Sequence, residues 1–364
     1  MDDIRPPIDK EPERFIDQLR RSIRNEGLSY ETEKTYVHWS KRFIRHHGFR
    51  HPTDMGAEQV TEFLTDLAER ARVAPATQRT ALNALVFLFQ RHLKQELGML
   101  PFRYAKKQRP MPSAFTHIEA NAVIEQLDGE TALIARLMYG AGLRVSETLR
   151  LRIKDIDFGA LQITVRDGKG SSDRCTLLPT SVVAPLTQQI EKVEKLHAFD
   201  TTCGYGKVYL PYALARKYPE LASETAWQFL FPAREISADP IDGTLRRHHR
   251  HPTGVQRAVK WAIKASGFKR KASCHTFRHS FATRLIETGY DIKLVQSLLG
   301  HKDIRTTEIY LHVVRNRAGA IVSPVDNLAT TLHRAAVADA RPASHRVNRA
   351  IPLRRQPPRR RVQN

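Results

Sequence analysis

Residues 274–285 read CHTFRHSFATRL, an apolar helical pattern that also carries two histidines and two arginines. Two phenylalanines and a leucine recur at i, i+4 and i+8, which is the face that a helix buries. His275, Arg278 and His279 fall on an adjoining face. The stretch therefore predicts a core helix whose second face meets a polar partner, namely a metal ion, a salt-bridge network or a bound phosphate.

The length and composition around this stretch are those of a folded chain. Its 364 residues are enough for about two domains with cores of their own, and 41% of them are hydrophobic. The apolar runs are too short to cross a bilayer, and the N-terminus lacks the apolar segment of a secretory signal. Three widely spaced cysteines argue against a disulfide framework. We therefore expect a cytoplasmic protein.

The chain is strongly basic. It contains 59 Lys and Arg against 38 Asp and Glu, which gives a formal net charge of +21. Residues 341–364 contribute eight of the arginines and no acid, yet the rest of the chain keeps a large positive excess. Such a charge attracts polyanions, so we expect nucleic acid as the partner.

The residue pattern divides the chain into four parts. Residues 10–100 hold three apolar helical stripes and predict a small all-helical domain. Residues 101–114, which include PFRYAKKQRPMP, have the composition of a basic linker. A capping box that begins at Thr116 opens a second domain over residues 115–328. Residues 335–364 are expected to form a basic, disordered tail.

Two segments of the second domain carry isolated cations. Arg144 lies in the turn before a predicted helix, in GLRVSETLR, that Ser146 is placed to cap. An arginine at a helix N-terminus is well placed to help bind an anion. LQITVRD and DRCTLLPT predict two strands around GKGSS, a hairpin with Lys169 at its tip. Alone, this lysine identifies no function.

Residues 199–231 are rich in aromatic side chains, with eight in 33 positions against 8% in the whole chain. Two interpretations are open: a subdomain whose rings bury one another, or a surface on which bases stack. The basic run RRHHRH follows at residues 246–251. It has no carboxylate or cysteine in register, which favours a phosphate or base contact over a metal site.

The isolated signals form one ordered set. GLRVSE, HTFRHSFAT, LLGH and TTEIY, together with the hairpin lysine, resemble the tyrosine recombinases of the phage integrase type over about residues 12–328. The resemblance implies a SAM-like α-helical core-binding domain and a mixed α+β catalytic domain of the DNA breaking–rejoining fold, closed as a clamp around DNA. It implies six catalytic residues: Arg144, Lys169, His275, Arg278, His301 and Tyr310.

Three further stretches, LPYALARKYP, AWQFLFP and RRHH, look like the additional segment of integron integrases, placed here at about residues 196–233. Integron integrases insert and excise gene cassettes, and this region holds bases that protrude from a folded single-stranded cassette site. The resemblance therefore implies DNA partners in duplex and folded single-stranded form, and self-association into a synaptic tetramer. It implies six DNA contacts: Lys217, Tyr218, Trp227, Pro240, His248 and His249.

The residue types fit DNA cleavage by a tyrosine. A phenol has a pKa of about 10 and needs help to act as a nucleophile at neutral pH. Arg144 and Arg278 can each fork onto oxygens of a scissile phosphate and stabilise the charge of the transition state, so no metal ion or other cofactor is expected. The resemblance makes Tyr310 the nucleophile, through a 3′-phosphotyrosyl intermediate, and Lys169 the general acid. Glu147 is expected to orient the first arginine.

Other functions fit parts of the pattern. A tyrosine recombinase of the phage-integrase or chromosome-resolution type would act on duplex DNA only. A non-catalytic DNA-binding protein would explain the charge but not the ordered set of residues. A metal-dependent nuclease could use His275 and His279, which have the i, i+4 spacing of one metal site but lack a third ligand nearby. A type IB topoisomerase would share the covalent chemistry, but the integron-like segment argues against it.

Overall fold

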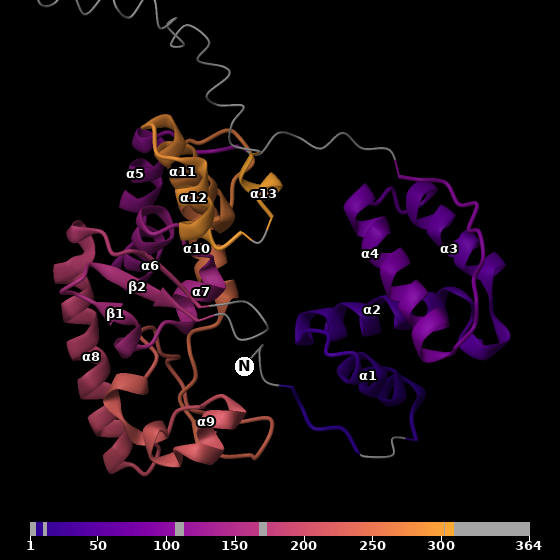
Figure 1. Cartoon of the computed structure of the whole chain (residues 1–364), viewed down its shortest axis with the longest axis horizontal. Coiled ribbons are helices and arrows are strands. Elements are labelled where there is room, and N and C mark those ends of the chain that lie inside the picture. The colour runs from indigo at the N-terminus through magenta and orange to yellow at the C-terminus, as the bar shows by residue number, and fades with distance from the viewer. Residues whose placement is uncertain (1–4, 10–12, 106–112, 167–172, 302, 309–364) are drawn as a thin grey trace, which may run out of the picture. The chain divides into compact units, whose positions relative to one another are not determined.

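The structure is a computed structural model that describes residues 5–9, 13–105, 113–166, 173–301 and 303–308 (Figure 1). The parts on either side of the 106–112 gap each fold around a hydrophobic core of their own. None of the helices in the described ranges has the length and apolar character needed to cross a bilayer.

The N-terminal part is all helical, as the sequence predicts. Phe43 packs edge to face against Phe63 and Phe89 in its core, with ring centroids 5.6 and 5.8 Å apart. Glu33 is fully buried, and ion pairs with Arg20 and Arg24 offset the cost of burying its charge. The helices are α1 (Phe15–Asn25), α2 (Tyr30–His46), α3 (Ala57–Glu69), α4 (Pro75–Val86), the 3₁₀ turn η1 (Pro52–Asp54) and the π-helix η2 (Phe87–His92).

The C-terminal part combines two small antiparallel sheets with helices, which confirms a mixed α and β domain. The first sheet has the order β1-β2-β3, and Val165 pairs with Arg174 at its open end. The two predicted strands are thus confirmed as β2 and β3, while residues 167–172 between them lie outside the described residues. The strands are β1 (Ile156–Asp157), β2 (Gln162–Val165), β3 (Arg174–Leu177), β4 (Ser237–Ala238) and β5 (Leu245–Arg246).

The helices of this part carry most of its core. They are α5 (His117–Glu125), α6 (Gly129–Gly140), α7 (Val145–Arg150), α8 (Val183–Thr202), α9 (Tyr212–Lys217), α10 (Pro252–Ala265), α11 (Cys274–Glu287), α12 (Ile292–Leu299) and α13 (Arg305–Glu308). Four 3₁₀ turns lie between them: η3 (Ile153–Asp155), η4 (Thr180–Val182), η5 (Pro219–Ser223) and η6 (Thr225–Trp227).

The helix predicted over residues 274–285 is confirmed as α11, and its apolar face is buried. Phe277 is fully buried, with its ring centroid 5.2 Å from that of Phe115 and 6.4 Å from that of Tyr139. Phe281, one turn later, belongs to a neighbouring apolar cluster shared with α12. One side of α11 therefore packs on the main core through Phe277, and another packs on α12 through Phe281. The polar face lies between these two sides.

One predicted helix start is wrong. The sequence favoured Ser146 as the cap of α7, but the N-cap residue is Arg144 and the helix begins one residue before Ser146. Glu147 stands three residues after Arg144, and its carboxylate accepts the backbone N–H of Arg144 at 2.8 Å. A glutamate that reaches back in this way satisfies the first free N–H of the helix, so a serine cap is not needed.

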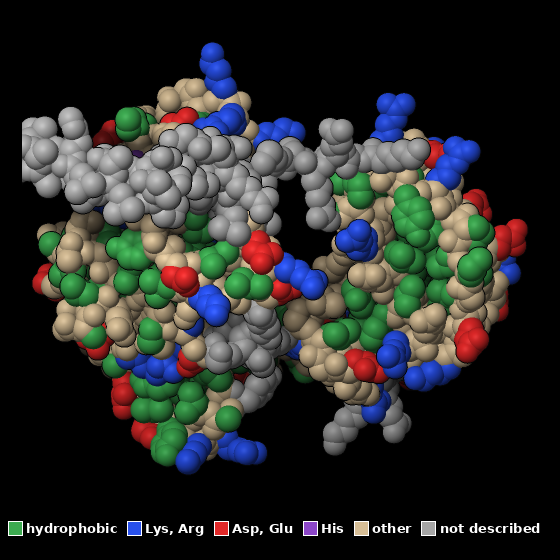
Figure 2. Space-filling model, turned by 45° about the horizontal axis from the view of Figure 1, so that its top comes forward, with side chains coloured by type: hydrophobic (Ala, Val, Ile, Leu, Met, Phe, Trp, Pro, Cys, Tyr) green, Lys and Arg blue, Asp and Glu red, His purple; other side chains and the backbone are tan. Residues whose placement is uncertain are grey.

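Basic side chains lie on the surface of both described parts of the chain. Figure 2 shows Lys and Arg side chains on the visible face of both parts of the chain, beside hydrophobic and acidic ones. A polyanion can meet such a surface at several points.

The turn between α6 and α7 depends on a glycine. Gly142 has a φ of +66°, and a Cβ at this position would lie 2.4 Å from Cδ1 of Phe281 and 3.2 Å from Cδ2 of Leu299. Its carbonyl accepts a hydrogen bond from Arg278 at 2.7 Å. A left-handed backbone, a buried ring and a buried guanidinium therefore meet at a residue that has no room for a side chain.

Gly142→Ala is expected to lower the free energy of unfolding by at least about 2 kcal/mol, because it adds left-handed strain to an overlap with a buried ring. Gly267→Ala is the matched control, since its φ is +74° but no atom lies within 4 Å of an added Cβ. That control should cost only about 1 kcal/mol. Urea unfolding followed by circular dichroism measures both, and equal losses would contradict the close approach at Gly142.

Candidate functional site

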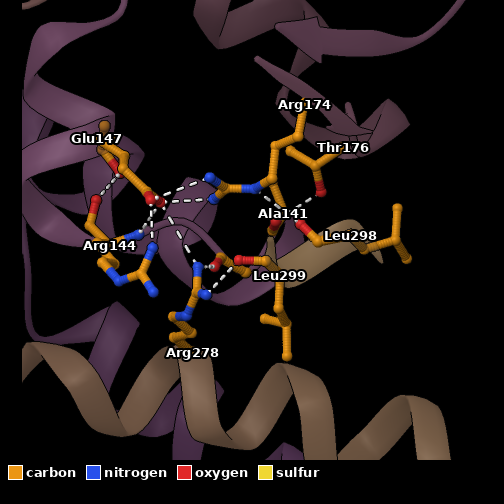
Figure 3. A network of polar contacts seen from close by, with 10 residues as sticks. Ala141, Arg144, Glu147, Arg174, Thr176, Arg278, Leu298 and Leu299 are labelled. Carbon is orange, nitrogen blue, oxygen red and sulfur yellow. Dashed lines mark hydrogen bonds and ion pairs between the residues drawn. The ribbon is translucent and has the colours of Figure 1, made fainter. Parts of the chain in front are cut away.

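The polar face of α11 meets one carboxylate, which belongs to Glu147 of the neighbouring helix α7. Glu147 of α7 pairs with Arg144 at 2.5 Å and with Arg174 of β3 at 2.7 Å, measured from nitrogen to oxygen. Arg278 of α11 lies 3.5 Å from the same carboxylate. Figure 3 shows the three guanidinium groups converging on it from different elements. Three cations and one carboxylate leave an excess of positive charge, which suits an anion.

The three arginines differ in how far they reach solvent. The exposed fraction of the side chain is 39% for Arg144, 10% for Arg174 and 1% for Arg278. Arg278 is held by backbone oxygens, because Nη1 donates to the carbonyl of Gly142 at 2.7 Å and Nη2 to that of Leu299 at 2.5 Å. The salt-bridge network is therefore present, and Arg144 is its most accessible cation.

The network keeps the central carboxylate charged. Burial alone would raise the pKa of Glu147, but the hydrogen bonds and charges of Arg174 and Arg144 outweigh burial and lower this pKa from 4.5 to about 2. Glu147 is therefore an anion at neutral pH. The expectation that it orients Arg144 agrees with their ion pair.

Two histidines lie within electrostatic range of the same arginines. His301 follows α12, and its Nδ1 is 2.9 Å from Oγ1 of Thr307. Burial, followed by the charges of Arg278 and Arg144, lowers the pKa of His301 to about 4. Desolvation and the same two arginines also lower the pKa of His275. Both imidazoles are therefore neutral at pH 7, when each ring has one nitrogen that donates and one that accepts.

Of the six predicted catalytic residues, Arg144 and Arg278 contact Glu147, and His275 and His301 lie near enough for the charges of these arginines to lower the pKa of each ring. The other two, Lys169 and Tyr310, lie outside the described residues. The catalytic roles of all six residues remain predictions.

Arg174 belongs to the network but was missed by the sequence analysis. A signal for it existed in the alternation of β3, whose residues 174 and 176 share one face. Thr176 on that face is buried, whereas Cys175 and Leu177 on the other face are exposed. An arginine on the inward face of a strand calls for a buried anion as its partner, and Glu147 is that anion.

The aromatic segment forms a small apolar cluster of its own. Phe229 is buried in it, and Trp227 packs against it. Two cations cover these rings: Nζ of Lys154 lies 3.2 Å from the centre of the Trp227 ring, and the guanidinium of Arg152 lies 4.5 Å from that of Phe229. Phe229 is therefore buried mainly among aliphatic side chains and beneath a cation, and the interpretation that the aromatic rings bury one another stays a prediction.

The six predicted DNA contacts differ in exposure. Lys217 and Tyr218, at the end of α9, are exposed, and Nζ of Lys217 lies 5.1 Å from the Tyr218 ring centre. Trp227 and Pro240 are partly exposed. His248 and His249 are buried, with only 4% and 9% of each residue exposed. As the chain stands, the histidine rings are enclosed, and the accessible aromatic rings of this set are Tyr218 and Trp227.

No three His, Cys, Asp or Glu side chains gather as a metal site within the described ranges. The rings of His275 and His279 stack edge to face on α11, with centroids 4.5 Å apart. This pair has the spacing that the sequence analysis considered for a nuclease.

Family comparisons assign both parts of the chain. The model of the phage integrase family matches residues 113–317. The model described as the phage integrase N-terminal SAM-like domain matches residues 15–99. Together they cover the helical part and the part that holds the Glu147 network.

Curated relatives match over most of their length. An integrase/recombinase of Escherichia coli is 42% identical over 316 residues, which cover 86% of this chain and 94% of that protein. A protein of the same description from Pseudomonas aeruginosa matches equally well. A tyrosine recombinase of Thermosipho africanus is 28% identical over 318 residues, covering 84% of this chain and 96% of its own.

Solved structures share the fold. The Tn1549 transposon integrase in complex with transposon right end DNA has a TM-score of 0.57 at 17% identity, covering 88% of this chain and 99% of that one. The XerH recombinase bound to its palindromic difH substrate has a TM-score of 0.56 at 18% identity, covering 84% of each chain. A lambda integrase tetramer on a Holliday junction has a TM-score of 0.56 at 17% identity, covering 81% of this chain and 75% of that one.

The charge of Glu147 predicts a pH-dependent contribution to stability. Its folded pKa of about 2 lies below the ordinary 4.5, so the folded state binds fewer protons than the unfolded state between these values. The contribution is therefore complete above about pH 4.5 and is lost as the pH falls toward 2. It amounts to roughly 3 kcal/mol at neutral pH.

Glu147→Gln should remove this contribution. Urea unfolding of both proteins, from pH 7 down to about pH 3, should show a stability gap that is largest at neutral pH and narrows on acidification. A gap of constant size across this range would contradict the assignment.

Proposed function

The chain belongs to the phage integrase family and is a tyrosine site-specific recombinase, and on this basis we propose that it inserts and excises gene cassettes, acting on folded single-stranded cassette sites. The observation that carries the catalytic part of the proposal is the contact of Arg144 and Arg278 with one charged carboxylate, near enough to His275 and His301 for both arginines to lower the pKa of each ring. An excess of guanidinium charge beside neutral imidazoles is what transfer of a phosphodiester requires.

The proposed chemistry starts at the scissile phosphate. The phenolic oxygen of Tyr310 attacks the phosphorus, which forms a 3′-phosphotyrosyl bond as the bond to the 5′ oxygen breaks. Arg144, the accessible cation, stabilises the charge that grows on the non-bridging oxygens, and the positive charge of buried Arg278 adds to this stabilisation. Lys169 gives its proton to the departing 5′ oxygen. Attack by another strand's 5′ hydroxyl reverses these steps and reseals the DNA without ATP.

The two histidines take different proposed roles. His275 accepts the phenolic proton of Tyr310 as its oxygen attacks the phosphorus, and His301 donates a hydrogen bond to the phosphate. The lowered pKa of each imidazole supports these roles, because a neutral ring has one N–H to donate and one nitrogen to accept a proton. No cofactor enters this scheme.

DNA is the proposed partner. The net charge of +21 supports it, as do the similar folds of recombinases solved with DNA, such as the XerH and Tn1549 proteins. The lambda integrase tetramer on a Holliday junction supports a synaptic tetramer for this chain as well. A protein that acts on DNA and has three cysteines without a disulfide pattern is proposed to work in the cytoplasm.

Cassette activity rests on the aromatic segment. Exposed Tyr218 and partly exposed Trp227, with Lys217 and Lys154 beside them, combine rings on which bases can stack with cations for the backbone. We propose these residues as contacts for protruding bases. Pro240, His248 and His249 complete the proposed contact set, and the burial of the two histidines requires this region to rearrange if they touch a base.

The same burial favours a second candidate function. If His248 and His249 stay enclosed, the segment supports the fold rather than the bases, and the enzyme is a phage-integrase or chromosome-resolution type that acts on duplex DNA only. The two functions share the chemistry of Tyr310 and differ in substrate. Strand preference separates them.

Tyr310→Phe should bind a labelled recombination site with unchanged affinity but form no covalent adduct, because it lacks the nucleophilic oxygen. Denaturing gels measure the adduct, and native gel shifts measure binding. Adduct that persists in the variant would move the nucleophile elsewhere. Wild-type cleavage that is lost in excess EDTA and restored by a divalent ion would instead support a nuclease.

The wild-type enzyme should prefer one folded strand of its cassette site over the complementary strand and the duplex. Trp227→Ala should reduce this preference by about 10-fold, since stacking is worth roughly 1–3 kcal/mol per base. Trp261→Ala removes an indole that is 60% exposed on α10 and should retain the preference. Gel shifts with both strands and their duplex measure the effect, after thermal melts confirm folding. Equal binding of both strands by wild type would favour the duplex-only enzyme.

A further inference from the structure

All three guanidinium nitrogens of Arg174 donate hydrogen bonds to protein oxygens. Its Nη2 and Nη1 donate to the two oxygens of Glu147 at 2.7 and 3.1 Å, and its Nε donates to the carbonyl of Leu298 at 3.1 Å. Only 10% of the side chain is exposed. A planar fork that meets both carboxylate oxygens fixes their orientation as well as their charge.

The contact with Leu298 completes the end of α12. The last four carbonyls of a helix, here residues 296–299, have no partner within it. The carbonyl of residue 296 accepts the backbone N–H of His301 at 3.2 Å, and that of residue 297 accepts the backbone N–H of Gly300 at 3.0 Å. The carbonyl of Leu298 accepts a hydrogen bond from Nε of Arg174 at 3.1 Å, and that of Leu299 accepts one from Nη2 of Arg278 at 2.5 Å. Two arginines therefore finish the helix from which His301 emerges.

Arg174 also lies against the residue that precedes His301. Gly300 has a φ of +63°, and a Cβ there would lie 2.6 Å from Cδ of Arg174 and 3.1 Å from its Nε. The arginine side chain thus crosses the backbone at Gly300. A glycine is needed both for the left-handed helix end and for this close approach.

We propose that Arg174 is a positioning residue for strand cleavage, which orients Arg144 through the shared carboxylate of Glu147 and places His301 through the end of α12. The proposal rests on the proposed function for its effect on cleavage. Its structural part concerns this chain's own residues and can be tested without DNA.

Electrostatics supports the same link. The charge of Arg174 helps to lower the pKa of His301, after burial, Arg278 and Arg144. Its hydrogen bond and charge are the largest effects that lower the pKa of Glu147 against burial. Arg174 therefore acts on both halves of the site that it joins.

The test compares Arg174→Ala and Arg174→Lys with wild type. Under single-turnover conditions at saturating enzyme, the alanine variant should form covalent adduct about 100-fold more slowly, because small misplacement of catalytic groups costs this much. The lysine variant keeps the charge but lacks the fork, and should be slower by about 10-fold. DNA affinity should change little in both.

Two further measurements separate positioning from general stability. An NMR titration of the His301 ring, without DNA, should show a higher pKa in Arg174→Ala than in wild type, because a nearby positive charge is gone. Arg24→Ala is the matched control, because it breaks a similar ion pair in the N-terminal part of the chain. There Nε and Nη2 of Arg24 donate to the two carboxylate oxygens of buried Glu33 at 2.9 and 3.0 Å. That variant should lose stability but keep the His301 titration and the single-turnover rate.

Each outcome bears on the proposal. A cleavage rate and a His301 titration in Arg174→Ala equal to wild type, in folded protein, would overturn it. If the alanine variant does not fold, Arg174→Lys decides, and full activity of the lysine variant would rule out positioning by the fork. If wild type forms no adduct at all, the proposed function fails, while an altered His301 titration would still support the link through α12.

Discussion

A single, largely enclosed carboxylate holds the candidate site together, since only 13% of the Glu147 side chain is exposed. Glu147 offsets the mutual repulsion of three guanidinium groups, which would destabilise the fold if they were gathered without an anion. Its partners come from the N-terminus of α7, from β3 and from α11, so the ion pairs also fix how these elements meet. The carboxylate carries one negative charge against three positive ones. The group that makes the cluster stable therefore leaves the charge excess that a phosphate needs.

Much of the fold follows from residues that are close in sequence, which is why the sequence predicted it. The capping box at Thr116 forms with Glu119, and the period of α11 places Phe277 in the core. The two strands on either side of the Lys169 segment could also be predicted, because alternation and turn residues are local signals. Ser146 was the exception. There the competing local signal, a glutamate three residues after Arg144, formed the cap instead.

The features that the sequence did not predict depend on contacts between residues that are distant in the chain. Arg174 meets Glu147 across 27 positions and Leu298 across 124, and no local pattern encodes either pairing. The burial of His249 has a similar origin, since its backbone bridges to Pro232 in another segment. A run of arginines and histidines indicates charge, but its exposure is decided by what packs on it. The family resemblance proposed the catalytic residues but did not indicate Arg174, which contacts the carboxylate between Arg144 and Arg278.

The arrangement couples phosphate binding to the proton balance of the site. With only protein groups nearby, burial and then the charges of Arg278 and Arg144 lower the pKa of His275 and His301, so both imidazoles are neutral at pH 7. In the proposed function a phosphodiester binds near Arg144 and Arg278, and its negative charge would offset the arginines and raise the pKa of both rings. In the proposed reaction an imidazole thus becomes a better proton acceptor when the scissile phosphate arrives. Glu147 stays charged throughout, so the change in protonation on phosphate binding falls on the two histidines. These are the groups for which proton transfer is proposed.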